Sequence, residues 1–401
     1  MSVRIRPIAA LAVAVPATLL AALLPALPAA ARMGPSWATG PDYSPPLGTT
    51  GAEWRDVTAT GPADIWAVGV RRTPAENPLT ARWNGKGWEA VPTPAAPAGQ
   101  RYDLTAVDAV APGDVWAVGS AASATRSAAA LHYDGAWTAV ALPAPPIGQS
   151  SELSDLDLTA TDGWAVGYAA TGVKPPRALV LRRQGASWKT VTVPDGDATS
   201  TELSAVFTRA VDDVWAVGSQ LRVDGRRVGL IMHWDGTNWK EQAAPVVGDA
   251  DEETFLASVS GLTPDDVWAA GRVCREGTGL EQCRPLALHL TGGAWTVVPT
   301  NGEESELTEV ITFSPADVWV IGYAGDSTLN ETDYAEHWNG EVFTPDATVP
   351  ADPSPDGPIV FNGEPASALS AATAIPGTGA IWAVGWTRDP IRGGSHVVHR
   401  G

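Results

Sequence analysis

One six-residue phrase recurs along the chain, and its regular spacing constrains the fold more strongly than any other feature. Every copy has Trp at its third position and Gly at its sixth. The seven copies are Asp64–Gly69, Asp114–Gly119, Asp162–Gly167, Asp213–Gly218, Asp266–Gly271, Asp317–Gly322 and Ala380–Gly385. Their tryptophans are 50, 48, 51, 53, 51 and 63 residues apart. Such self-similarity predicts one supersecondary unit that is copied in a repeat architecture.

The second copy shows what each repeat contains. Alternating apolar residues predict short strands, and Pro112–Asp114 and Asp134–Gly135 have the composition of tight turns. The four expected strands are Leu104–Val110, Val115–Gly119, Ala130–Tyr133 and Trp137–Leu142. Four antiparallel strands per repeat make one propeller blade. The sequence therefore predicts an all-β fold, a seven-bladed β-propeller of four-stranded antiparallel blades.

The first and last segments of the repeat region are expected to form one blade together. The seventh copy stops at Val397–Gly401, where a third strand is ending, so its fourth strand is missing. Near the N-terminus, Gly34–Trp37 matches the opening of a fourth strand. We therefore expect an N-terminal strand to close the last blade and to remove the open sheet edges that invite aggregation.

The N-terminus has the pattern of a secretory signal peptide. Two arginines precede an apolar stretch, and small residues follow it up to Ala31. This pattern predicts a signal peptide over 1–31 and a single propeller domain over 32–401. An uncleaved anchor is the alternative, because the apolar stretch is nearly long enough to span a bilayer, but Pro16 and Pro25 favour cleavage. We expect the mature chain to be secreted or extracellular.

The two cysteines, Cys274 and Cys283, lie close together in an expected loop. In an exported protein such a pair predicts a short-range disulfide. Closing a loop of this size stabilises a protein by about 2 to 3 kcal/mol. A zinc site is not expected, because the additional ligands that zinc needs are not nearby.

The formal net charge is −19, and the excess Asp and Glu residues are scattered along the chain. Such a surface repels phosphate backbones and anionic membranes. We therefore expect no nucleic-acid partner and no membrane contact after signal cleavage. The expected form is a monomer that binds a glycan, a protein or a small molecule.

The repeats resemble those of kelch-type propellers, including the central propeller of galactose oxidase. They are more similar still to a family of secreted bacterial proteins with Asp-Val-Trp-Ala-Val-Gly repeats, from about Ser36 to Gly401. They depart from kelch repeats in having one Gly, not two, after the second strand. The copper site of galactose oxidase needs two Tyr, two His and a Cys joined to one Tyr, and here both cysteines lie in one loop. The resemblance implies the fold and leaves the function open.

Residues that repeat in every blade are expected to serve the fold, whereas a single site around the axis should break the symmetry. We therefore interpret the second-strand tryptophans as packing residues and the Asp residues before them as turn residues. The third strand carries His in five blades and Arg in two, which we also interpret as structural. These residues are His132, His233, His289, His337 and His399, with Arg82 and Arg182. His396 alone departs from the repeat position.

Strand direction places all the tight turns on one face of the ring. The long, variable connections then share the other face, which we call the loop face, and binding residues concentrate on such loops. On that face the residue entering the innermost strand is a carboxylate in five blades. The carboxylates are Glu53, Asp103, Glu152, Glu202 and Glu306, with Phe255 and Ala368 in the other two blades.

We consider two roles for this ring of carboxylates at the channel mouth. It could bind a cation such as Ca²⁺, which takes several oxygen ligands, or a cationic group of a ligand. Alternatively, each carboxylate caps the backbone of a neighbouring blade. No other cofactor is expected.

The connections between second and third strands are rich in Arg, including Arg388. These arginines could meet the carboxylates or sulfates of a polysaccharide, or they could be solvated loop charges. Trp386 and the insertion Thr344–Pro365 also break the symmetry on this face. The candidate ligand-binding residues are therefore the five carboxylates of the ring together with Arg388 and Trp386.

The sequence contains no recognisable catalytic constellation, so we name no catalytic residue. We predict a secreted or cell-surface propeller that binds a glycan, protein or small-molecule ligand around its central channel. The alternative is a propeller enzyme, a lyase, hydrolase or cyclase acting on a metabolite or polysaccharide. Such an enzyme would use the carboxylates at the channel mouth, with an Arg to hold an acidic substrate.

Overall fold

A computed structural model describes residues 36–41, 52–71, 77–145, 150–172, 174–194, 196–275, 282–325, 331–350, 367–387 and 394–401. The compact unit that we describe is Pro35–Gly401. The signal peptide expected over 1–31 lies outside the described residues. The described part of the chain consists of strands, turns and loops, and it holds no helix that is long and apolar enough to cross a membrane.

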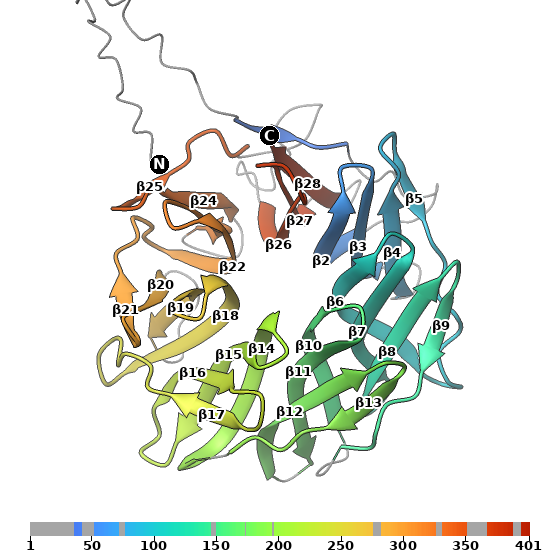
Figure 1. Ribbon diagram of the computed structural model, residues 1–401, viewed down its shortest axis with the longest axis horizontal. Coiled ribbons are helices and arrows are strands. Elements are labelled where there is room, and N and C mark those ends of the chain that lie inside the picture. The colour runs from blue at the N-terminus through green and yellow to red at the C-terminus, as the bar shows by residue number, and fades with distance from the viewer. Residues whose placement is uncertain are drawn as a thin grey trace, which may run out of the picture. The chain divides into compact units, whose positions relative to one another are not determined.

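Seven antiparallel sheets of four strands form a ring in the described unit (Figure 1). Blade 1 is β2 (Ala52–Gly61), β3 (Asp64–Arg71), β4 (Asn77–Trp83) and β5 (Trp88–Ala90). Blade 2 is β6 (Arg101–Ala111), β7 (Asp114–Ala122), β8 (Arg126–Asp134) and β9 (Trp137–Val140). Blade 3 is β10 (Ser150–Leu158), β11 (Asp162–Thr171), β12 (Lys174–Gln184) and β13 (Ser187–Thr190).

Blade 4 is β14 (Ala198–Ala210), β15 (Asp213–Arg222), β16 (Arg227–Trp234) and β17 (Trp239–Gln242). Blade 5 is β18 (Glu252–Thr263), β19 (Asp266–Arg275), β20 (Cys283–Thr291) and β21 (Ala294–Val298). Blade 6 is β22 (Ser305–Ser314), β23 (Asp317–Ala324), β24 (Thr332–Trp338) and β25 (Phe343–Pro345). The first strand of each blade lies nearest the centre of the ring (Figure 1), so the predicted seven-bladed β-propeller is confirmed.

Blade 7 joins the two ends of the chain, as the sequence predicts. It contains β26 (Ser367–Ala374), β27 (Ile381–Thr387), β28 (Gly394–Arg400) and β1 (Trp37–Thr39). Trp37 pairs with Arg400 in this sheet, and its indole meets that of Trp319 in blade 6 edge to face, with ring centroids 6.0 Å apart. The N-terminal strand therefore both completes the last sheet and packs against the preceding blade.

Four second-strand tryptophans, Trp66, Trp116, Trp215 and Trp319, donate an indole hydrogen bond to the Asp two residues earlier. In blade 4 the indole Nε1 of Trp215 donates a hydrogen bond to Asp213 (3.0 Å), and His233 Nε2 lies 2.8 Å from the same oxygen. The His233 ring stacks on Trp215 at 4.2 Å between centroids. The same set of contacts recurs in blades 2 and 6, and Arg replaces His in blades 1 and 3. The aspartates thus fix the tryptophans, a larger role than the turn position expected from the sequence.

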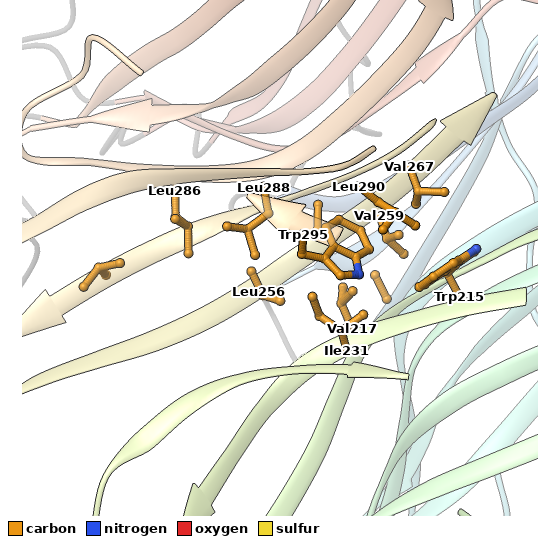
Figure 2. Close-up of a cluster of buried hydrophobic side chains, with 13 residues drawn as sticks. Trp215, Val217, Ile231, Leu256, Val259, Val267, Leu286, Leu288, Leu290 and Trp295 are labelled. Atoms are coloured by element: carbon orange, nitrogen blue, oxygen red, sulfur yellow. The ribbon is translucent and has the colours of Figure 1, made fainter. Parts of the chain in front are cut away.

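The hydrophobic clusters lie between consecutive blades. Figure 2 shows the cluster in which Trp215 and Ile231 of blade 4 meet Leu256, Leu288 and Trp295 of blade 5. Other clusters join the remaining neighbours in the same way, for example blades 1 and 2 or blades 3 and 4. Since each cluster draws on two sheets, the blades stabilise one another and the ring must be complete.

The glycine that ends every copy of the repeat phrase is required for steric reasons. The innermost strand of every blade contains a bulge, located in blade 2 between Leu104 and Ala106. This bulge brings the carbonyl oxygen of Asp103 so close to Gly119 that a Cβ there would lie 2.0 Å away. A larger residue is therefore excluded. The same glycine contact recurs at the ring position of the other blades and fixes where those residues lie.

The predicted disulfide is confirmed. Cys274 at the end of β19 is bonded to Cys283 at the start of β20, and the two residues are directly paired in the sheet. The bond closes the connection between the second and third strands of blade 5 on the loop face. An oxidising compartment suits a protein with such a bond.

The closure of blade 7 gives the first testable prediction. Trp37 is 4% exposed, so W37A should lower the free energy of unfolding by about 3 to 5 kcal/mol through the lost core contact. Urea denaturation of residues 32–401, followed by far-UV circular dichroism, measures this loss. The matched control is V223A at a side chain that is 75% exposed, which should leave the midpoint unchanged. An unchanged midpoint in W37A would contradict a closing role for β1.

Candidate functional site

The candidate residues of the carboxylate ring occupy equivalent positions in the structure. Each lies near the loop-face end of an innermost strand, one residue before the buried side chain that precedes the bulge. The register pairs are Glu53 with Val70, Asp103 with Ser120, Glu152 with Tyr168, Glu202 with Ser219, Phe255 with Arg272, Glu306 with Tyr323, and Ala368 with Trp386. The equivalence of these positions follows from the repeat, while their partners come only from the structure.

Five side chains of blades 1 to 3 form a continuous set of polar contacts that we call the mouth network: Arg55, Asp103, Arg126, Glu152 and Tyr168. Arg55 bonds to Asp103 of the next blade. Arg126 Nη1 lies 3.2 Å from Asp103 Oδ2 and 2.6 Å from Glu152 Oε2. The Tyr168 hydroxyl donates to Glu152 Oε2 at 3.1 Å. Arg126 thus joins the carboxylates of two neighbouring blades.

Burial within the mouth network is unequal. The side chains of Asp103 and Glu152 are 6% and 13% exposed, whereas those of Arg55 and Arg126 are 34% and 40% exposed. The two carboxylates are therefore the buried partners of these ion pairs, and the two arginine side chains are the more accessible partners. The two arginines and the two carboxylates of the mouth network balance in charge, and the arginines are the more accessible pair.

The protonation states of the mouth network are set by these neighbours. Burial, together with the adjacent Glu152 carboxylate, raises the pKa of Tyr168 to about 12. Burial acts to lower the pKa of Arg126, but the carboxylates of Glu152 and Asp103 outweigh it and raise that pKa. At neutral pH Tyr168 is therefore a hydrogen-bond donor and Arg126 a cation.

A second, smaller group lies at the mouth in blades 5 and 6. Arg272 bonds to Glu306, and the Tyr323 hydroxyl donates to the same carboxylate at 2.7 Å. The Arg272 guanidinium also lies over the Phe255 ring, 4.7 Å from its centroid. Burial lowers the pKa of Arg272 and raises that of Tyr323. Phe255, which interrupts the carboxylate ring, thus serves as a flat surface for an arginine.

The remaining predicted site residues are not brought into these groups. Glu202 lies next to the mouth network, where its charge helps to raise the pKa of Tyr168, and Glu53 lies at the same level in blade 1. Trp386 is partly buried opposite Ala368. Arg388 and most of the insertion Thr344–Pro365 lie outside the described residues.

Sequence reasoning missed five carboxylates that line the central channel, a cavity of about 390 Å³. They are Asp56, Asp108, Asp155, Asp157 and Glu309. Asp56 Oδ2 accepts a hydrogen bond from the Val107 amide of the next blade at 2.7 Å, and Asp155 does the same for Val206 at 2.8 Å. These channel carboxylates thus cap the backbone of a neighbouring blade, which is the role considered above for the carboxylate ring.

The channel carboxylates resist ionisation. Burial raises the pKa of all five, and repulsion between them adds to the effect at Asp155 and Asp157. The pKa of Glu309 rises to about 8. The side chains still keep some contact with the channel space. Among the residues described here, no group of His, Cys, Asp or Glu is arranged to hold a metal ion.

No known protein-family model and no curated protein sequence matches this chain. Solved structures with the same fold include YCF48 bound to a D1 peptide, at 14% identity and a TM-score of 0.50, covering 91% of this chain and 96% of that one. The GH74 xyloglucanase from Xanthomonas campestris has 14% identity and a TM-score of 0.52 over 87% of this chain and 53% of that one. The polysaccharide lyase Uly1 has 9% identity and a TM-score of 0.50 over 91% of both. These similarities establish the propeller fold and do not single out kelch proteins or galactose oxidase.

The channel carboxylates predict an unusual dependence of stability on pH. The pKa of Glu309 is about 8 in the folded chain and about 4.3 when unfolded, so its protonated form stabilises the fold fully below the unfolded value. That contribution is lost as the pH rises through about 8. We therefore expect the melting temperature to fall between about pH 5 and pH 9.

Differential scanning calorimetry of wild type and E309Q checks this expectation. The neutral Gln should remove part of the fall, whereas E341Q at an exposed position should not. A melting temperature that rises across this range, or an identical slope in E309Q, would show that Glu309 ionises freely in the folded protein.

Proposed function

We propose that this chain is an extracytoplasmic binding protein whose channel mouth, on the loop face, takes an acidic glycan. One observation carries the proposal: the half-exposed side chains of Arg55 and Arg126 are held in place by the buried carboxylates of Asp103 and Glu152. Planar guanidinium groups pair well with carboxylates and sulfates, with two parallel hydrogen bonds.

The mouth network is organised before any ligand arrives. Arg126 is already bonded to two carboxylates, and Tyr168 is bonded to one of them. Little side-chain entropy then remains to be lost on binding, which favours affinity. The arginine side chains are more exposed than the carboxylates that hold them, which favours an anion over Ca²⁺ or a cationic group at blades 1 to 3.

Aromatic side chains lie at the equivalent positions of other blades. Phe255, Tyr323 and Trp386 occupy or face the ring position in blades 5, 6 and 7. Flat aromatic surfaces combined with a few charged hydrogen-bonding groups are typical of ligand sites. Together with Arg55 and Arg126 they support a sugar polymer that crosses the mouth.

The enzymatic alternative has less support from the mouth network. Asp103 and Glu152 are the two carboxylates of the mouth network, and Arg126 bonds to both. Tyr168 holds its proton, because its pKa is raised to about 12, so it is a poor general base at neutral pH. A binding role needs neither group to change its protonation state. Export and a monomeric state belong to the same proposal, and the disulfide of Cys274 with Cys283 supports export.

Binding of polygalacturonate and of neutral xyloglucan to residues 32–401 tests the proposal. We expect polygalacturonate to bind, with an affinity that falls as salt is added. R126Q should weaken this affinity by about tenfold or more, the loss expected for a charged hydrogen bond. Microscale thermophoresis measures both effects.

R284Q is the matched control. Arg284 is 43% exposed and bonds to Glu252 at 2.7 Å, much as Arg126 bonds to Glu152, but its partner belongs to its own blade. Its substitution should leave binding unchanged. Equal binding of the neutral polymer, or equal loss in R126Q and R284Q, would refute an anion site at the mouth. Depolymerisation of polygalacturonate by wild type and not by E152Q would favour the enzyme.

A further inference from the structure

A second cavity on the loop face lies apart from the channel. The connection from β5 to β6, residues 91–100, lines a half-open pocket of about 650 Å³ together with the loop-face ends of β3 and β4. We call this space the crossover pocket. Its lining includes Arg71, Thr80, Tyr102 and three prolines of the connection, Pro92, Pro94 and Pro97. The volume lies within the range of small-molecule sites.

The wall of the crossover pocket is rigid. The Val91 amide donates a hydrogen bond to the Thr80 carbonyl at 2.9 Å, and the Thr80 hydroxyl donates to the Val91 carbonyl. Gln100 closes a turn by donating from its amide to the Pro97 carbonyl at 2.9 Å. Each proline fixes one backbone dihedral. The pocket is therefore formed before a ligand binds, which reduces the entropic cost of binding.

Arg71 brings an unsatisfied positive charge to this pocket. It makes no hydrogen bond or ion pair with any described residue, and its Nε is buried without a partner. Other arginines of the loop face, such as Arg126, Arg272 and Arg284, each bond to a carboxylate. A buried donor without a partner lowers the stability of the fold. A ligand that places an acceptor at the Arg71 Nε would remove this cost and gain affinity.

Tyr102 supplies a second donor beside Arg71. The residue is 5% exposed and belongs to the hydrophobic cluster that Val91 and Ala96 contact. Its hydroxyl makes no hydrogen bond with a residue in the described ranges. Burial raises the pKa of Tyr102, so the hydroxyl keeps its proton and can donate it to an anion.

We propose that the crossover pocket binds a small molecule that carries one carboxylate and an apolar body. Arg71 is the counter-ion of the carboxylate, Tyr102 donates a hydrogen bond to it, and Pro92, Pro94 and Pro97 contact the apolar part. A pocket of about 650 Å³ suits a single acid better than a polymer. This site is independent of the glycan proposed for the mouth.

Isothermal titration calorimetry of residues 32–401 tests the proposal with three probes. N-acetyl-L-leucine has the expected chemistry, D-galacturonate replaces the apolar body by a sugar, and N-acetyl-L-leucinamide lacks the carboxylate. We expect N-acetyl-L-leucine to bind and its amide not to bind. Tighter binding of D-galacturonate would keep the carboxylate site and assign it to sugar acids. Binding of the amide as well as the acid, or of no probe, would overturn the proposal.

Variants locate the binding. R71Q should weaken the affinity for N-acetyl-L-leucine by about tenfold or more, R71K should retain part of it, and R126Q should leave it unchanged. Loss in R126Q without loss in R71Q would place the acid at the mouth and overturn the crossover site, while polygalacturonate binding reports on the mouth separately. If R71Q failed to fold, a crystal of wild type soaked with N-acetyl-L-leucine would decide, with density beside Arg71 expected and an empty pocket contradicting it.

Discussion

The packing of one tryptophan per blade against the neighbouring blade is the interaction on which the rest of the structure depends. Six of these tryptophans are at most 4% exposed and Trp382 of blade 7 is partly buried, and the hydrophobic clusters around them draw on two sheets at a time. Asp and His, or Asp and Arg, hold many of the indoles in one orientation. Because no blade has a core of its own, the ring is stable only when closed, which is why β1 returns to complete blade 7.

The same packing determines what the centre of the ring can do. The bulge in each innermost strand fits against the glycine of the second strand, and it places the ring position at the same level in every blade. Just beyond the bulge, channel carboxylates cap amides of the next blade. The channel carboxylates therefore stabilise the contact between neighbouring blades. The groups more available to a ligand lie at the channel mouth, where the side chains of Arg55 and Arg126 are half-exposed.

Much of the fold follows from the sequence, because the number of repeats predicts the number of blades and the tight turns predict the strand order. The set of equivalent residues around the channel also follows, since they recur at the same place in the repeat. Its chemistry does not follow. Arg55 and Asp103 are 48 residues apart, and their contact depends on the neighbouring blade's orientation. Asp155 and Asp157 alternate along a strand, but the sequence gives no sign that they cap the backbone of blade 4.

Hydrogen exchange with and without polygalacturonate tests most directly the claim that repeated residues build the ring and that ligands bind where the repeat is broken on the loop face. Peptides that contain the loop-face ends of β6, β8 and β10 should gain protection, because the mouth network lies there. Peptides that contain the tight turns at Gly113, Gly135 and Gly236 should be unchanged. Protection at those turns, with none at the mouth, would contradict the claim.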